Sequence, residues 1–355
     1  MELRETEGKS STDEQLNLPL AVAGASLAPR LPEATPLLAD PCDPKRTRRG
    51  VIAEKQSLYV HRQLIWGETK GMRNSPEKHV LYKQMDGCSG EARFLEEHLQ
   101  SQFIPPHGPN QLLSPRAFFV SPLFRVCRDR EAREAAVKLD LLPKSSSILR
   151  YEGPELRQCD GLVFLTLLHL LRDVQVGTSV SVHPDEICKA IFGGYDGHKR
   201  KKLQEHIQRL QKGLIILAGS SVQLCLRFDF PTVGSWTVGL DPKIVELFKV
   251  SPETWLRLEP RLALSSGLTT WLFSFVEAQT RLIPMQLNVI REACGSKADE
   301  KGFCNRMRKA LKQLAGSDII DTGWKIRRGE LHWRKPGKNR DTRYYLENSG
   351  NTYLD

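Results

Sequence analysis

One order of predicted elements occurs twice in this sequence, and this repetition limits the possible folds more than any other feature. The first copy has an apolar helical segment, a short β-like stretch and two further helices, in GLVFLTLLHLLRDVQ, TSVSV, EICKAIF and GHKRKKLQEHIQRLQKG. The second copy has SGLTTWLFSFVEAQT, IPMQL, NVIREAC and DEKGFCNRMRKALKQLAG in the same places. A β-rich pair follows each third helix, LIILAGSSVQLCLRFDF in one copy and DIIDTGWKIRRGELHW in the other. Helix, strand, helix, helix and hairpin is the order of a winged helix, a helix-turn-helix variant backed by a hairpin.

The sequence therefore predicts an α+β fold with two tandem winged-helix domains, at residues 111–240 and 241–340, and a C-terminal tail at 341–355. Residues 1–110 are rich in Pro, Ser and mixed charge and are predicted to form a flexible, largely disordered N-terminal leader. Disorder is favoured for the first fifty residues, and the structure of 51–110 stays open. Within it, EARFLEEHLQSQF has the pattern of one short amphipathic helix. Between the leader and the first copy, RAFFVSPLFRV and SSSILRYEGPEL have the composition of strands.

The third helix of the first copy combines an apolar stripe with a polar and cationic outer face. A step of about 100° per residue places Leu203, Ile207 and Leu210 on one side, where they would seat the helix. The predicted DNA contacts on the other side and its flanks are His198, Lys199, Arg200, Lys201, Lys202, Glu205, Gln208, Arg209 and Lys212. Gln208 and Arg209 carry donors that suit adenine and guanine edges, and Glu205 could accept from a cytosine amine or brace a lysine.

The third helix of the second copy has the same two faces. Its predicted seat is Phe303, Met307, Ala310, Leu311 and Leu314. The predicted DNA contacts are Lys301, Asn305, Arg308, Lys309 and Lys312 on the helix, and Lys325, Arg327, Arg328, Arg334 and Lys335 in the hairpin. We expect Trp324 and Trp333 to brace the core or the hairpin. Taken singly, each helix also fits an ordinary amphipathic helix with a solvated charged face; the repetition favours DNA.

The charge balance agrees with a polyanionic partner. The chain of 355 residues has a formal net charge of +10, and clustered cations gain affinity for nucleic acid by displacing counterions. The eight cysteines stand singly, without a CxxC pair or a histidine at zinc-finger spacing, so we expect neither a disulfide framework nor a metal or other cofactor. The polar N-terminus and the short apolar runs predict a cytoplasmic protein that is neither exported nor bound to a membrane.

One short peptide in the leader has a separate interpretation. QLNLPL stands alone among polar residues and resembles the hexapeptide by which bacterial proteins dock on the replicative sliding clamp. Its predicted clamp contacts are Gln15, Leu16, Leu18, Pro19 and Leu20. A peptide stiffened by proline loses less entropy on docking. The alternative is a chance apolar cluster in a low-complexity leader.

From about Ser114 to Trp333 the chain resembles the TrfA-type plasmid replication initiators, which are related to other iteron-binding Rep proteins. The likeness rests on PLFRV, ILRYEGPELRQCDGLVFLTLL, SVHPDEICKAIF, HKRKKLQEHIQRLQ and VGLDPKIVELF, and on the whole second copy. The resemblance implies two winged-helix domains that bind direct repeats (iterons) at a plasmid origin. It also implies local melting to single-stranded DNA, recruitment of the host replicative helicase, and homodimers that limit copy number.

Two other classes of function are alternatives to initiation. An enzyme is disfavoured because the sequence has no GxxxxGK[ST] phosphate loop and no HxH pair near a tyrosine that could nick DNA. A winged-helix transcriptional repressor or autoregulator without initiation activity stays open, because winged helices serve both roles. A protein–protein adaptor would bind with little dependence on salt, whereas DNA binding should weaken steeply as salt rises.

Overall fold

The computed structural model describes residues 47–70, 72, 76–127, 131–142, 149–231 and 234–336, all of which belong to one compact unit, 41–355. Helices and short strands alternate in it, so the mixed helix and sheet character predicted from the sequence is confirmed. None of the helices in these ranges is both long enough and apolar enough to cross a membrane.

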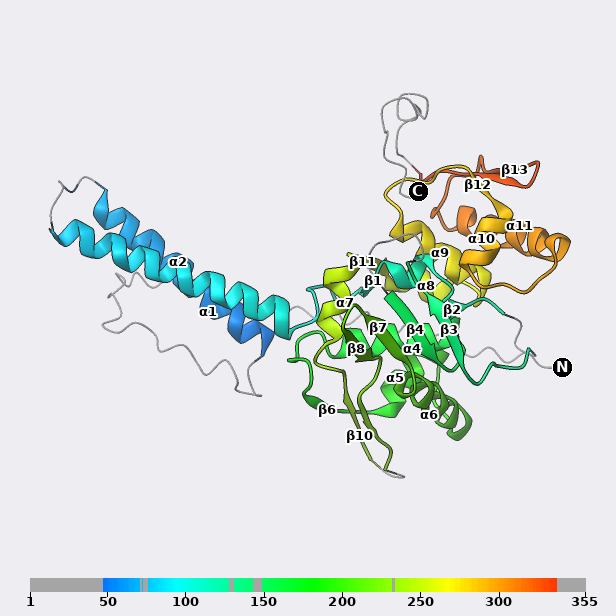
Figure 1. The fold of residues 1–355 in the computed structure, drawn as a ribbon, viewed down its shortest axis with the longest axis horizontal. Helices are drawn as coiled ribbons and strands as arrows, with labels where there is room; N and C mark the ends of the chain where they lie inside the picture. The colour runs from blue at the N-terminus through cyan, green and yellow to red at the C-terminus, as the bar shows by residue number, and fades with distance from the viewer. Residues whose placement is uncertain are drawn as a thin grey trace, which may run out of the picture. The chain divides into compact units, whose positions relative to one another are not determined.

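The first two helices form a hairpin, α1 (Arg48–Thr69) and α2 (Pro76–Gln102), which lie side by side in Figure 1. Val51, Leu58 and Ile65 are buried at steps of seven residues along α1, and this spacing keeps one apolar seam facing a neighbouring helix. At the start of α1, the backbone N–H of Arg48 donates to Asp173 O, and its guanidinium donates to the carbonyls of Ile104 and Arg172. The prediction of a flexible leader as far as residue 110 is therefore wrong for α1 and α2.

The first copy of the repeat contains the three helices and the intervening strand expected from the sequence, and a hairpin that lies later in the chain than expected. They are α4 (Gln158–Leu170), β6 (Ser179–Val182), α5 (Pro184–Phe192), α6 (Gly197–Gln211), β9 (Arg227–Asp229) and β10 (Trp236–Gly239). The three strands form an antiparallel sheet in the order β6-β10-β9, with Val238 opposite both Val180 and Phe228. The first strand of the unit thus pairs with its last strand.

The second copy repeats this arrangement with shorter strands. Its elements are α9 (Leu268–Ala278), β12 (Met285–Gln286), α10 (Leu287–Ala293), α11 (Glu300–Gly316), β13 (Lys325–Arg327) and β14 (Glu330–His332). Their order in the sheet is β12-β14-β13, so the first strand again pairs with the last. The repetition seen in the sequence is therefore present in the topology.

One predicted hairpin is corrected by the structure. The β-rich segment directly after α6 forms β7 (Leu214–Leu217) and β8 (Ser220–Gln223), which join β3 (Val137–Asp140) and β4 (Leu149–Gly153) in a separate sheet of order β3-β4-β7-β8. The side chains of Ile215 and Tyr151, on paired residues of β7 and β4, are fully buried. The pairing of β7 is determined by burial of its side chains against β4, a strand about 60 residues earlier in the chain. The hairpin that belongs to the first copy is therefore β9–β10.

A second correction concerns the segment between α2 and β3. The sequence predicts a strand there, but the segment contains β1 (Gln111–Pro115), the short α3 (Ala117–Val120) and β2 (Phe124–Arg125). β1 pairs with β11 (Glu253–Arg257), and β2 pairs with β5 (Leu156–Arg157). The helices α7 (Ile244–Val250) and α8 (Leu258–Ala263) flank β11.

This segment lies between two hydrophobic cores and contributes to both. Some of its side chains belong to the first core and others to the second. Phe118 and Phe124 belong to the core around α4 and α6, whereas Phe119 and Val126 belong to the core around α9 and α11. The backbone N–H of Val126 also donates to the carbonyl of Cys294, at 2.9 Å. The two repeated units are therefore packed against one shared segment.

Candidate nucleic-acid interface

The seat of α6 is the one predicted from its periodicity. Leu203, Ile207 and Leu210 are fully buried in the first core. The helix begins after Asp196, whose carboxylate accepts from the backbone N–H of Lys199 at 2.8 Å and so caps an unsatisfied donor. The buried stripe fixes which side of α6 faces solvent.

The opposite side of α6 is exposed over most of the predicted contact residues. Six of these side chains are exposed: His198, Lys201, Lys202, Glu205, Gln208 and Lys212. Lys199 and Arg200 are half-buried because both have partners: Lys199 Nζ lies 3.4 Å from the Asp196 carboxylate, and Arg200 donates to the carbonyl of Pro231 at 3.0 Å. The Arg200 guanidinium also lies 5.3 Å from the ring centre of Trp236, which ties α6 to the β9–β10 hairpin.

Arg209 departs from its predicted role. Its Nε donates to the carboxylate of Asp160 at 2.8 Å, and the side chain is only 20% exposed. A guanidinium held on a buried acid inside the protein is not available to read a guanine edge, so Arg209 is corrected from a base contact to a structural residue.

Asp160, which the sequence did not single out, is the centre of this buried cluster. It is fully buried at the start of α4, where it accepts from the backbone N–H of Arg157, from Arg209 and from Arg133, each at 2.8 Å. The Nδ1 atom of His206 lies 2.7 Å from Oδ1 of the same carboxylate. Burial alone would raise the pKa of Asp160, but the His206 hydrogen bond and the charges of His206, Arg209 and Arg133 lower that pKa well below its usual range.

The third helix of the second copy presents an exposed face that is richer in cations. Its predicted seat is buried: Phe303, Met307, Ala310, Leu311 and Leu314. Its predicted contact residues are all open to solvent: Lys301, Asn305, Arg308, Lys309 and Lys312. The helix starts after Asp299, whose carboxylate accepts from the backbone N–H of Gly302 at 3.2 Å. The amphipathic pattern of the sequence therefore separates core from surface correctly in α11.

The β13–β14 hairpin carries three further exposed cations, Lys325, Arg327 and Arg328. Its two turn residues, Arg328 and Gly329, have φ of 50° and 80°, the left-handed values that a tight two-residue hairpin requires. After the hairpin, Arg334 pairs with Asp321 at 3.1 Å and Lys335 is half-buried.

The two tryptophans of this region have the bracing role predicted for them. Trp333 is buried and its indole N–H donates to the carbonyl of Ile283 at 2.9 Å. Trp324 packs against the same core.

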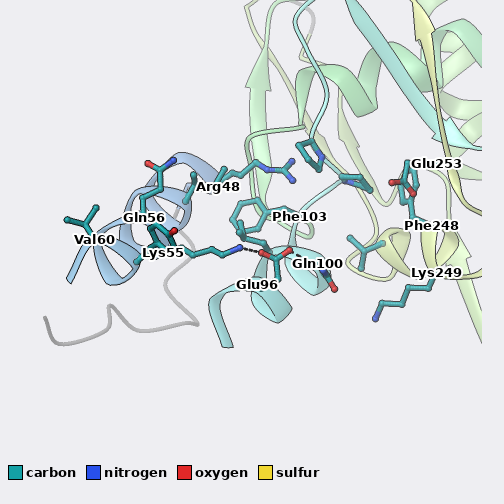
Figure 2. A pocket seen from close by; sticks show the side chains of 16 residues that line it. Arg48, Lys55, Gln56, Val60, Glu96, Gln100, Phe103, Phe248, Lys249 and Glu253 are labelled. Carbon is teal, nitrogen blue, oxygen red and sulfur yellow. Dashed lines mark hydrogen bonds and ion pairs between the residues drawn. The ribbon is translucent and has the colours of Figure 1, made fainter. Parts of the chain in front are cut away.

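A separate hollow of about 970 Å³ lies away from both third helices, among α1, α2 and α7. Figure 2 shows Phe103 within it and the ion pair of Lys55 with Glu96 beside it. Lys249 and Glu253 belong to its rim from the other side. No set of three or more side chains suited to hold a metal ion occurs within the described ranges. The exposed cationic faces of α6 and α11 lie outside this hollow.

Some predicted residues lie outside the part of the chain that the structure describes. These are the clamp-like peptide, with Gln15, Leu16, Leu18, Pro19 and Leu20, and the tail at 341–355.

Comparison with known proteins shows a match to a family. A family model described as TrfA protein matches residues 99–332, which is more than half of the chain. No curated protein sequence matches. Among solved structures, the crystal structure of selenomethionine derivatives of domains 2 and 3 of RctB aligns with a TM-score of 0.42 and 12% identity, over 62% of this chain and 96% of that chain.

Proposed function

This chain belongs to the TrfA family of replication initiators, and from that premise we propose that it starts plasmid replication by binding direct repeats at an origin through two winged-helix modules. The observation that carries the proposal is the repeated order of helix, strand, helix, helix and hairpin. In each copy the third helix has an exposed face with several cations. Pairing of the first strand with the last supports the winged-helix assignment, because it closes a three-stranded sheet whose last two strands form a hairpin that can serve as a wing. Arg200 on Pro231 and Trp236 joins helix and wing in the first module.

The second module is the stronger base reader under this proposal. Its outer face has Asn305 and Arg308 one turn apart, with Lys301, Lys309 and Lys312 beside them. Asparagine and arginine are the side chains that pair with adenine and guanine edges, and lysines neutralise phosphates. In α6, by contrast, the engagement of Arg209 with Asp160 leaves Gln208 as the main candidate for a base edge.

The first experiment tests the role of α11 with the double variant Arg308→Ala and Lys312→Ala. Its matched control is Arg257→Ala with Lys249→Ala, which removes two exposed cations outside both third helices. We expect the α11 variant to weaken binding by about 1–3 kcal/mol for each base-reading side chain removed, and to flatten the plot of log affinity against log salt by about 0.9 for each phosphate no longer neutralised. Affinity is measured by fluorescence anisotropy on duplexes that the full chain selects from a random pool. Equal affinities of the variant and the control would remove α11 as a reader.

The proposal includes origin melting and recruitment of the host replicative helicase and sliding clamp in the bacterial cytoplasm. Melting would draw on binding energy and DNA bending without ATP hydrolysis. Permanganate reactivity of unpaired thymines next to the bound repeats tests it on a supercoiled plasmid carrying the cognate origin. Protection of the repeats without reactive thymines would instead favour a repressor that binds the same DNA.

The clamp peptide is tested by pull-down of purified sliding clamp with the full chain. Leu18→Ala with Leu20→Ala should abolish retention because the variant lacks both apolar side chains that would fill the clamp pocket, while DNA binding stays unchanged. Clamp retention at the wild-type level by this variant would eliminate the peptide as a docking element.

A further inference from the structure

Arg125 connects the two copies of the repeat, called here the first unit (α4 to β10) and the second unit (α9 to β14), through the turn between α10 and α11. It lies on β2 with a side chain only 10% exposed. Its Nε donates to the carbonyl of Gly295, at 2.6 Å, in that turn of the second unit. Its Nη1 donates to Glu155, at 2.9 Å, directly before β5, which leads into α4 of the first copy. One guanidinium thus joins the second copy to the residues that lead into the first, with its fork of donors fixing the direction of each contact.

Gly295 fits closely against this side chain. Its φ is +63°, and a Cβ built there would lie 2.9 Å from Cγ of Arg125 and 3.1 Å from Cβ of Pro122. Both the backbone conformation and the space therefore require glycine. Any larger residue would push the turn, and with it the start of α11, away from β2.

The same cluster continues to the third helix of the first unit. The carboxylate of Glu155 is almost fully buried and accepts from both Arg125 and Arg157. Arg133 donates to the carbonyl of Glu155 at 3.0 Å and to Asp160 at 2.8 Å. Asp160 in turn holds Arg209 of α6. A continuous set of hydrogen bonds thus joins α6 to the turn that precedes α11.

Apolar packing and further hydrogen bonds at the junction add to these contacts. Leu165 of α4 belongs to the second core, and the indole N–H of Trp271 on α9 lies 3.4 Å from the carbonyl of Ser121. Gln158 accepts from Thr270 of α9 at 3.2 Å. The two units therefore meet through a buried surface and not through a linker.

We propose that Arg125 is a positioning residue: with Gly295 and Glu155 it holds α6 and α11 at one mutual placement, so that the protein binds two DNA segments at one separation. This inference rests on the proposed function, in which both third helices contact DNA. Each added base pair moves the second segment by about 3.4 Å and turns it by about 35° around the duplex. A rigid pair of readers cannot follow such a change, whereas a loosely joined pair can.

The test uses the full chain and a selected duplex in which a footprint has located the two contacted segments. Base pairs are added or removed one at a time between the segments, and each affinity is measured by anisotropy. We expect the affinity of the wild type to fall about ten-fold when the separation changes by two base pairs, because only one segment can then be bound. Arg125→Ala should bind all separations within about three-fold of one another, and its affinity for a duplex with only one segment should match the wild type.

Two further variants separate positioning from folding. Gly295→Ala disturbs the same contact from the other side and should flatten the dependence on separation in the same way. Lys297→Ala removes an exposed ion pair with Glu134 at the rim of the same junction and should keep the wild-type preference. Wild-type binding without any preferred separation would overturn the positioning role while leaving the proposed function intact. Failure of the wild type to bind any duplex would overturn both.

Discussion

Replacing Asp160 with asparagine tests whether the buried cluster stabilises the fold. The variant keeps the volume of the side chain but removes its charge, so it creates no cavity and leaves Arg133, Arg209 and His206 without their anionic partner. Breaking a fully buried ion pair from one side costs about 3–5 kcal/mol. Arg133 and Arg209 are 29% and 20% exposed, so water can solvate both after the change. We therefore expect the low end of that range, about 3 kcal/mol.

The assay is urea unfolding followed by tryptophan fluorescence. With a slope of about 3 kcal/mol per molar, a destabilisation of about 3 kcal/mol lowers the midpoint by about 1 M. The control is Asp140→Asn, which breaks an ion pair of similar length with Arg150, at 2.9 Å, but between side chains that are 59% and 47% exposed. The control should be destabilised by no more than about 0.5 kcal/mol. Similar destabilisation of the two variants would refute the claim that burial determines how much an ion pair contributes to the free energy of unfolding.

The dependence on pH provides a second test of the same reasoning. Because folding lowers the pKa of Asp160, its carboxylate stabilises the fold fully above the unfolded pKa, near 4, and this contribution declines as the pH falls below that value. The stability gap between the wild type and Asp160→Asn should narrow by about 1 kcal/mol between pH 5 and pH 3. A gap that widens on acidification would contradict the assignment of a depressed pKa.

Three further predictions follow from backbone conformation and burial. Gly87→Ala with Gly90→Ala should stabilise α2 by about 0.5–1 kcal/mol per site, because both glycines are helical and a Cβ at either meets open space. The thermal unfolding midpoint, followed by circular dichroism, should therefore rise, and a lower midpoint would contradict this. Gly329→Ala should cost about 1 kcal/mol in urea unfolding because its φ is +80°, whereas Gly316→Ala, with open space and no positive φ, should cost nothing. Burial raises the pKa of the Cys294 thiol to about 12. Maleimide at about pH 8 should therefore modify the half-buried Cys304 before Cys294, as followed by mass spectrometry, and equal rates for the two thiols would count against the burial of Cys294.

Sequence periodicity is sufficient to predict the two third helices. The apolar stripes of α6 and α11 are buried where a helical period places them, since a local pattern decides which side of a helix faces the core. Contacts between residues far apart in the chain cannot be predicted in this way. Arg209 lies at the edge of the outer face of α6, and its partner Asp160 is 49 residues earlier. Likewise, the pairing of β7 with β4 depends on a distant strand and not on the hairpin-like sequence that follows α6.

The helical hairpin does have one signal in the sequence, although the composition around it points to disorder. Val51, Leu58 and Ile65 recur every seven residues, which is the spacing of a helix–helix seam. The surrounding residues are mostly polar. Without knowledge of the partner helix, this polar composition predicts disorder more strongly than three widely spaced apolar residues predict a helix. For the clamp-like peptide no such comparison can be made, because residues 15–20 lie outside the described ranges.

The shared segment 111–126 has a consequence for synthesis on the ribosome. Phe119 and Val126 are made early, but the core that buries them is completed only when Leu331 and Trp333 have been added. At about 5–20 residues per second, the nascent chain needs on the order of ten to forty seconds to cover that distance. During this interval the core that buries these side chains is incomplete, so the growing polypeptide is exposed to premature association. Slowing translation beyond residue 240 would prolong this interval and lower the yield of native protein.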